Sequence, residues 1–371
     1  MAATVARRGS MRRGAVRTGP AHAWRGRAGA LVATGALLAL AACGSPAATP
    51  APTVTARADV AADKQAVPAP EVPATWPLTG VEGVPDPRPA IGVKIENTSA
   101  ARPQSGLDQA DVVWETIIEF EVSRLVAVFH SQAPEQVGPI RSVRPMDPQI
   151  VAPLGGMLAF SGGQPGIVDL VAASGVQQIS HDAGAPGLER VRTRKAPHNV
   201  YGSLATWWGI AEPGRTAPAE QFGFARSADR AAAVTAGTPA GTLAFRLSGQ
   251  SQPTWTWDGG TGTWLRSEGS APATAANGAR LSAVNVVAIT APHPNTGYGA
   301  QGGAPVPTYE LVGSGDAVVA TGGKTVAARW QKDAQDQPMR LLLPDGSEAS
   351  LAPGNTWVEL VPAGKGSLTI S

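Results

Sequence analysis

The sequence predicts an α+β protein in which a mixed N-terminal module, residues 76–225, precedes a mainly antiparallel β module, residues 226–371. Three observations support this fold class. Strand-like and helix-like segments both occur before residue 212, a stretch rich in Ala, Pro and Gly follows over 212–242, and strand and turn signals dominate beyond it. The chain of 371 residues is long enough for two folded modules besides a leader, since about 150 residues per domain is a usual prior.

Residues 1–42 are predicted to be the signal peptide of a bacterial lipoprotein. They hold seven Arg and no acidic residue, and they end in an apolar run, 28–42, directly before Cys43. Such a basic-then-apolar order is typical of export signals, and the run is shorter than the ~20 residues of a transmembrane helix. The small residues before Cys43 resemble a lipobox, which implies cleavage there and a diacylglyceryl group, with an added acyl chain such as palmitate. The alternative is a plain signal peptide in which Cys43 is incidental.

Lipidation of Cys43 predicts an anchor on the extracytoplasmic face of the cell membrane, reached by the general or the twin-arginine export route. Residues 43–75, mostly Ala, Pro, Thr and Val, are predicted to be a tether with too little apolar mass to fold. Cleavage changes the net charge from +2 to −5, because 23 basic residues then face 28 acidic ones. This balance argues against a nucleic-acid partner, which usually requires a basic face.

The N-terminal module is predicted from alternating and apolar segments. The strands 111–120 and 123–130 are close enough in sequence to form a hairpin, and Asn199 is the predicted N-cap of a helix. The predicted elements are strands over 90–97, 111–120, 123–130 and 157–160, a helical turn over 107–110, and helices over 167–173 and 199–211.

The C-terminal module is predicted to begin its sheet with a hairpin in which 254–257 and 263–266 flank an Asp-Gly-Gly turn. We expect Trp255, Trp257 and Trp264 to fill a small β core, with stacking on a sugar as the alternative. Further strands are predicted over 284–290, 308–312, 317–320, 339–343 and 357–361, with a turn over 313–316.

Five blocks occur in order along the N-terminal module: AARPQSGL (100–107), QADVVWE (109–115), SRLVAVF (123–129), VGPIRSVRP (137–145) and APHNVY (196–201). Together they resemble the YerB-like lipoproteins, a bacterial family of domains of unknown function. Looser similarity to the second module of that family lies at 285–287, at Trp330 and at 354–357. The resemblance implies an exported, two-module lipoprotein and no established activity. The connection 119–122, EFEV, departs from the family, where glycines are expected.

Six of the candidate ligand-binding residues lie in these blocks and the seventh, Arg194, lies just before the last of them: Glu115, Arg124, Arg141, Arg144, Arg194, His198 and Asn199. Arg141 and Arg144 lie between two prolines, so their segment is expected to be extended, and two fixed guanidinium groups suit a phosphate or a carboxylate. The alternative is an ion pair with Glu115 or Asp111. His198 is a candidate general base or metal ligand, or else a hydrogen-bonded side chain at a helix entry.

Glu115 and Glu119 would lie on one face of the strand 111–120, about 13 Å apart at ~3.3 Å per residue. That separation exceeds the ~5–9.5 Å of a glycosidase pair, so the sequence predicts a solvated outer face, with an ion pair from Glu115 to an Arg as the alternative.

Common catalytic motifs such as G-x-S-x-G and H-E-x-x-H are missing from the sequence. The lone Cys excludes an intrachain disulfide and a cysteine-based zinc site, and no metal or cofactor is indicated. We therefore predict an envelope binding or scaffold protein, with peptidoglycan or another wall polymer as the candidate partner. The alternatives are an enzyme acting on such a polymer through Glu115, Arg141, Arg144 and His198, and a partner-docking β module over 243–371.

Overall fold

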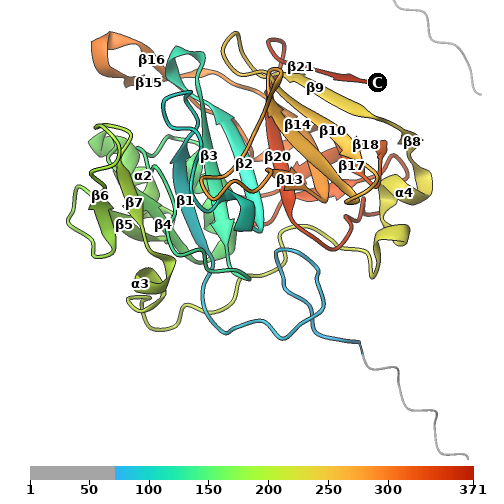
Figure 1. The fold of residues 1–371 in the computed structure, drawn as a ribbon, viewed down its shortest axis with the longest axis horizontal. Coiled ribbons are helices and arrows are strands. Elements are labelled where there is room, and N and C mark those ends of the chain that lie inside the picture. Colours follow the sequence, from blue (N-terminus) through green and yellow to red (C-terminus); the bar gives the residue numbers. More distant parts are fainter. Residues whose placement is uncertain (1–71) are drawn as a thin grey trace, which may run out of the picture. The chain divides into compact units, whose positions relative to one another are not determined.

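The computed structural model describes residues 72–371, so the predicted leader, Cys43 and nearly all of the predicted tether lie outside the described residues. Strands make up most of the regular structure and the helices are short (Figure 1). The α+β prediction is thus confirmed only in its two-module layout and its mixture of elements, because strands far outweigh helices. In the part of the chain that the structure describes, no helix is long and apolar enough to cross a membrane.

One large mixed sheet of eleven strands runs through both predicted modules. Across the sheet its strands are β19 (Arg340–Leu342), β18 (Lys324–Lys332), β17 (Gly313–Thr321), β14 (Asn285–Ala291), β20 (Thr356–Pro362), β2 (Val112–Ile117), β3 (Ser123–Phe129), β1 (Ile91–Glu96), β4 (Met157–Phe160) and β5 (Gln177–Ser180), with β8 (Thr238–Pro239) added to β18.

The two modules meet inside this sheet, at β20. This strand pairs in parallel with β14 of its own module and with β2 of the N-terminal module, which lies beside it in Figure 1. The register places Val112 opposite Thr356 and Glu115 opposite Glu359. The last strand of the large sheet in chain order therefore joins the two halves of the molecule.

The predicted hairpin of the N-terminal module is confirmed by the antiparallel pairing of β2 and β3. The first strand ends at Ile117, earlier than predicted, and a 3₁₀ turn, η2 (Glu119–Glu121), follows it. Within the turn Phe120 and Glu121 have φ values of 61° and 59°. Side chains other than glycine adopt this left-handed conformation at an energetic cost, which explains why glycines were expected at this connection.

The prediction of one helix over 199–211 is wrong. Val200–Gly202 forms strand β7, paired with β6 (Leu188–Arg190), and the helix α3 spans only Leu204–Trp208. Ser203 is its N-cap, with its hydroxyl accepting from the Thr206 N–H at 3.4 Å, so Asn199 does not have the predicted capping role. A β-branched and an aromatic residue at the start of the segment favour the strand.

The remaining helices are short and connect strands. They are α1 (Asp147–Val151), α2 (Pro165–Ala173), which confirms the helix predicted over 167–173, and α4 (Ala232–Ala236), with the 3₁₀ turns η1 (Leu107–Gln109), η3 (Ala152–Leu154), η4 (Ala228–Arg230) and η5 (Gln301–Gly303).

A second sheet belongs to the C-terminal module alone. It consists of β12 (Ala271–Pro272), β11 (Thr263–Glu268), β10 (Pro253–Asp258), β9 (Thr242–Arg246) and β21 (Ser367–Ile370), with β13 (Ser282–Ala283) paired to β11. The predicted tryptophan hairpin is β10–β11, where Trp257 lies opposite Trp264 with ring centroids 5.4 Å apart. Trp255 and Trp264 are fully buried, as expected of core residues.

Two predictions over 308–321 need correction. Residues 308–312 form no strand, while 313–316, predicted as a turn, begin the long strand β17. The Gly-Ser-Gly-Asp composition misled the prediction, because Gly315 serves close packing here: a Cβ on it would lie 2.5 Å from Nε1 of Trp330. The short hairpin β15 (Asn295–Gly299)–β16 (Pro305–Pro307) precedes this strand.

Candidate functional site

Two buried polar networks lie on opposite faces of the strands β1, β2 and β3. Successive side chains of a strand point to opposite faces, whereas paired residues on neighbouring strands share a face. Glu115 of β2 and its register partner Glu359 therefore point to one face, and Thr116 and its partner Arg124 point to the other.

The first network centres on Arg266 of β11, which is 1% exposed. Its guanidinium donates to Glu115 at 2.5 Å, to Glu359 at 2.7 Å and to Glu268 at 2.9 Å. The same group lies 4.5 Å from the ring centroid of Trp357, a cation–π contact. One buried arginine thus joins both sheets and both modules.

Ionising all three carboxylates around one buried guanidinium is energetically costly, because only one positive charge compensates them. Burial, and then the negative charge of Glu115, raise the pKa of Glu359 well above its ordinary 4.5, which favours the protonated form of this carboxyl. Burial also opposes ionisation of Glu115, but the Arg266 charge and hydrogen bonds such as that from Ser251 outweigh it and lower the pKa. Within residues 72–371, Oε2 of Glu359 has no hydrogen-bond partner.

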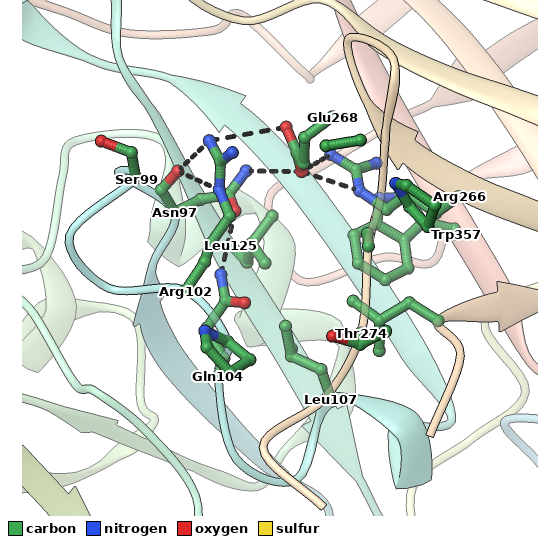
Figure 2. A pocket seen from close by; sticks show the side chains of 15 residues that line it. Asn97, Ser99, Arg102, Gln104, Leu107, Leu125, Arg266, Glu268, Thr274 and Trp357 are labelled. Atoms are coloured by element: carbon green, nitrogen blue, oxygen red, sulfur yellow. Dashed lines mark hydrogen bonds and ion pairs between the residues drawn. The ribbon is translucent and has the colours of Figure 1, made fainter. Parts of the chain in front are cut away.

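A pocket of about 270 Å³ opens beside this network, where the loop after β1 meets β11 and the segment after it. Figure 2 shows a polar wall that carries Asn97, Arg102 and Glu268 and an apolar wall that carries Leu107 and Leu125. We call it the junction pocket. Its lining residues are Asn97, Ser99, Arg102, Pro103, Gln104, Leu107, Leu125, Arg266, Glu268, Ala271, Pro272, Ala273, Thr274, Leu281 and Trp357.

The polar wall of the junction pocket is fixed by the buried network behind it. Arg102 lies 3.5 Å from Glu268, which in turn accepts from Arg266 (Figure 2). Gln104 donates to Asn97 at 2.9 Å, and Arg102 donates to the Asn97 carbonyl at 2.9 Å. Because each charged group in the wall has an opposite charge beside it, the wall is polar but electrically balanced.

The second network, on the opposite face, consists of ion pairs that link β1 and the turn η2 to residues 141–147, which lead into α1. Lys94 donates to Asp147 at 2.7 Å, and both side chains are fully buried. Arg144 forms a two-pronged ion pair with Glu119. Burial lowers the pKa of Arg144 to about 10 and that of Lys94 to about 8.

Glu96 is the third carboxylate of this network and is contacted by Arg141 and His198. Nε of Arg141 lies 3.6 Å from it, and Nδ1 of His198 lies 2.9 Å from it. Arg124, on the neighbouring strand, is buried and donates to the Ser142 carbonyl at 2.8 Å.

The predicted site residues therefore fall into separate groups. Arg124, Arg141, Arg144 and His198 lie on one face, while Glu115 lies on the other, so the Glu/Arg/His set of the enzyme hypothesis does not meet in one cleft. Arg194 donates to the carbonyls of Ala101 and Pro103 and ties down that loop. The amide oxygen of Asn199 accepts from Arg190 at 2.8 Å.

Two details of the prediction are corrected. Glu115 and Glu119 are 0% and 7% exposed, so they form no solvated outer face. Arg141 and Arg144 pair with Glu96 and Glu119 rather than with Glu115 or Asp111. The ion-pair alternative for Glu115 is the one that the structure contains.

Sequence reasoning missed Lys94, Arg266, Glu268 and Glu359. A usable signal existed, because Lys94 interrupts IGVKIE and Glu359 interrupts WVELV, so each places a charge inside an otherwise apolar strand. Within residues 72–371 no group of three or more His, Cys, Asp or Glu is placed to hold a metal ion.

Comparisons with known proteins agree on one family. The model described as "Protein of unknown function (DUF3048) N-terminal domain" matches residues 78–216, and the corresponding C-terminal domain matches residues 243–358. "Putative lipoprotein YerB" of Bacillus subtilis (strain 168) is 35% identical over 146 residues, which are 38% of this chain and 43% of the relative, so the match spans less than half of that relative. A crystal structure of the YerB protein from Bacillus subtilis superposes with a TM-score of 0.65 at 23% identity, covering 81% of this chain and 100% of that one.

Substitution of Arg266 by Met should be among the most destabilising changes in the molecule. It leaves Glu115 and its neighbours buried without a cation, which costs about 3–5 kcal/mol of unfolding free energy. Urea unfolding measures this loss. The matched control is Arg329→Met, because Arg329 is 59% exposed and pairs only with the exposed Asp316; its change should stay within about 0.5 kcal/mol. Equal effects of the two substitutions would contradict the central role of Arg266.

The raised pKa of Glu359 predicts a pH dependence of stability. Because the folded protein keeps this proton where the unfolded chain loses it, the contribution is present in full below about pH 4.5. It is lost as the pH rises through the raised folded-state pKa, by at most ~1.4 kcal/mol per pH unit. Glu359→Gln mimics the protonated acid, so its unfolding free energy should fall less than that of the wild type between pH 5 and pH 8. Urea unfolding at both pH values tests this, with the exposed Glu310→Gln as control; parallel curves would refute it.

Proposed function

The chain belongs to the family that carries the DUF3048 N- and C-terminal domains, and from this premise we propose that it is a lipid-anchored cell-envelope protein that binds a wall glycan in its junction pocket. The proposal has two parts, the anchor at Cys43 and the ligand of the pocket. Each part has its own support and its own test.

The anchor is supported by the sequence and by the name of a relative. Cys43 is the single cysteine and directly follows an apolar run that ends in small residues. The Bacillus subtilis relative is named "Putative lipoprotein YerB". Two or more acyl chains on one residue give stable membrane binding where a single chain binds only marginally. A protein held in this way on the extracytoplasmic face has wall polymers as its nearest ligands.

The chemistry of the junction pocket carries the ligand assignment. Planar amide, guanidinium and carboxylate groups line one wall, and Leu107, Leu125 and Leu281 line the apolar wall. A sugar residue presents hydroxyls to the first kind of surface and C–H groups to the second. Because the wall charges compensate one another, an uncharged ligand suits the pocket better than an ion.

The size of the pocket limits how much of a polymer it would hold. Its volume, about 270 Å³, lies at the lower end of the ~300–1,000 Å³ typical of small-molecule sites. A single sugar residue of a glycan is therefore the expected occupant, with the rest of the polymer outside. The position between segments of both modules also matches the usual placement of ligand sites at domain junctions.

Substitutions on the polar wall should weaken retention by purified peptidoglycan. Arg102→Gln removes a charged donor at the rim, where Arg102 is 32% exposed, and should reduce binding about tenfold. Thr274→Val removes one hydroxyl at nearly constant shape and should have a smaller effect in the same direction. Co-sedimentation with insoluble wall material measures both, and the control is Arg329→Gln on exposed surface. Retention equal to the wild type in both pocket variants would overturn the glycan assignment.

Replacing the lone cysteine tests the anchor separately. Cys43→Ala should move the protein from the membrane fraction to the soluble extracytoplasmic fraction and abolish metabolic labelling with palmitate, since no thiol is left to carry the lipid. Cell fractionation and labelling of the same cultures give both readouts. Membrane association that persists in the variant would show that lipid on Cys43 is not the anchor.

A further inference from the structure

The charges on the face of the sheet that α1 covers do not balance. Four basic side chains, Lys94, Arg124, Arg141 and Arg144, meet there with three carboxylates, Glu96, Glu119 and Asp147. Lys94 pairs with Asp147, Arg144 pairs with Glu119, and Arg141 shares Glu96 with His198. One cation, Arg124, is left over.

Arg124 is the residue that this count singles out. It is 6% exposed, and its guanidinium donates one hydrogen bond, from Nη1 to the Ser142 carbonyl at 2.8 Å. Among the residues that the structure describes, it forms no ion pair with a carboxylate. A buried charge without a counter-ion is costly, and arginine offers five N–H donors, so most of its hydrogen-bonding capacity is free.

Two further donors, on Arg141 and His198, contact Glu96, which is the register partner of Arg124 across β1 and β3. Burial and then the charge of Arg141 lower the pKa of Arg124 to about 10, while the charges of Glu96 and Asp147 act in the opposite direction. Nε of Arg141 is buried and has no hydrogen-bond partner in the described chain, although the side chain as a whole is 23% exposed. His198, at 28% exposed, lies against the same Glu96. The group is thus buried at Arg124 and open to solvent at Arg141 and His198.

The surroundings of this group are also basic. Arg190, Arg192, Arg194 and Lys195 precede His198 in the chain, and Arg194 packs against the loop that follows β1. The nearby Asp182, beside Gly162, is 64% exposed and lies 3.1 Å from Nδ1 of His181, so it does not neutralise Arg124. This positive charge favours the binding of an anion.

We propose that Arg124, Arg141 and His198 form a binding site for a phosphate-class oxyanion, either free inorganic phosphate or the phosphoryl group of an envelope molecule. The anion supplies the direct counter-ion contact that Arg124 lacks, and it accepts from the partly exposed guanidinium of Arg141 and from the imidazole of His198. Guanidinium groups match the spacing of phosphate oxygens with paired donors. A tetrahedral phosphate has more acceptor oxygens for donors from three chain segments than a carboxylate has.

This site is independent of the glycan assignment. The sheet lies between the arginine group and the junction pocket, because Arg124 and Glu115 point to opposite faces. Loss of phosphate binding would leave peptidoglycan retention in place, and the reverse also holds, so the two proposals can fail separately.

Calorimetric titration of the purified, full mature chain with inorganic phosphate tests the proposal. We expect saturable binding to the wild type and a loss of about tenfold or more in affinity for Arg124→Gln. The control Arg329→Gln, on exposed surface, should bind phosphate as the wild type does. Equal affinity in Arg124→Gln and wild type, or no saturable binding by the wild type, would overturn the site.

Thermal unfolding distinguishes a variant that has lost the phosphate site from one that fails to fold. Because Arg124→Gln removes an unpaired buried charge, its Tm without phosphate should equal or exceed that of the wild type. Phosphate should raise the wild-type Tm by about 2–4 °C and leave that of the variant unchanged. Arg141→Gln is the second variant and should lose the same phosphate-dependent rise; a rise preserved in both variants would contradict the proposal.

Two further ligands identify the source of the anion. Glycerol 3-phosphate that binds more tightly than inorganic phosphate would indicate an esterified phosphoryl group, and the reverse order would indicate free phosphate. Acetate serves as the carboxylate probe and should bind at least about tenfold more weakly than phosphate. Acetate binding as tight as phosphate would overturn the assignment to the phosphate class.

Discussion

The architecture depends on one buried contact, the guanidinium of Arg266 between Glu115 and Glu359. The two glutamates are register partners on β2 and β20, so they mark the point where the modules share a sheet. Arg266 comes from the second sheet and reaches both at 2.5 and 2.7 Å. A buried charge is stable only with its ion-pair partners around it, so this contact holds the second sheet against the β2–β20 pair. It also holds Glu268 at 2.9 Å and thereby shapes the wall of the junction pocket.

The pairing of β2 with β20 explains why the sequence predicted local structure better than the way the two modules pack together. The β2–β3 hairpin, the tryptophan hairpin and α2 depend on short-range patterns, and these were predictable. The pairing of β2 with β20 brings together residues more than two hundred positions apart in the chain. Strand periodicity assigns a residue to a face but does not identify the partner strand, so two modules were visible and their shared sheet was not.

The same limit applies to the candidate site. Arg141 and His198 were singled out from two separate blocks, 137–145 and 196–201, and the structure places both against Glu96. Glu115 was assigned to an outer face because alternation alone does not reveal that a second sheet covers it. Arg266 gave no signal of burial, because its strand, TWLRSE, has polar neighbours and suggests a solvent-facing side chain. Glu359 did give one, because a charge that interrupts an apolar strand is a recognisable pattern.

Opposite faces of one sheet thus present two different kinds of polar surface. On the face with Arg266, carboxylates outnumber the cation, the raised pKa of Glu359 favours its uncharged form, and the adjoining pocket pairs its charged groups with opposite charges. On the face with Arg124, cations outnumber carboxylates, and no bound proton can correct an excess of guanidinium groups, whose pKa lies above neutrality. An excess of buried acid can be relieved by protonation inside the fold, whereas an excess of buried arginine calls for an anion from outside. This asymmetry between the two charge types is the physical reason to look for an uncharged ligand on one face and an anion on the other.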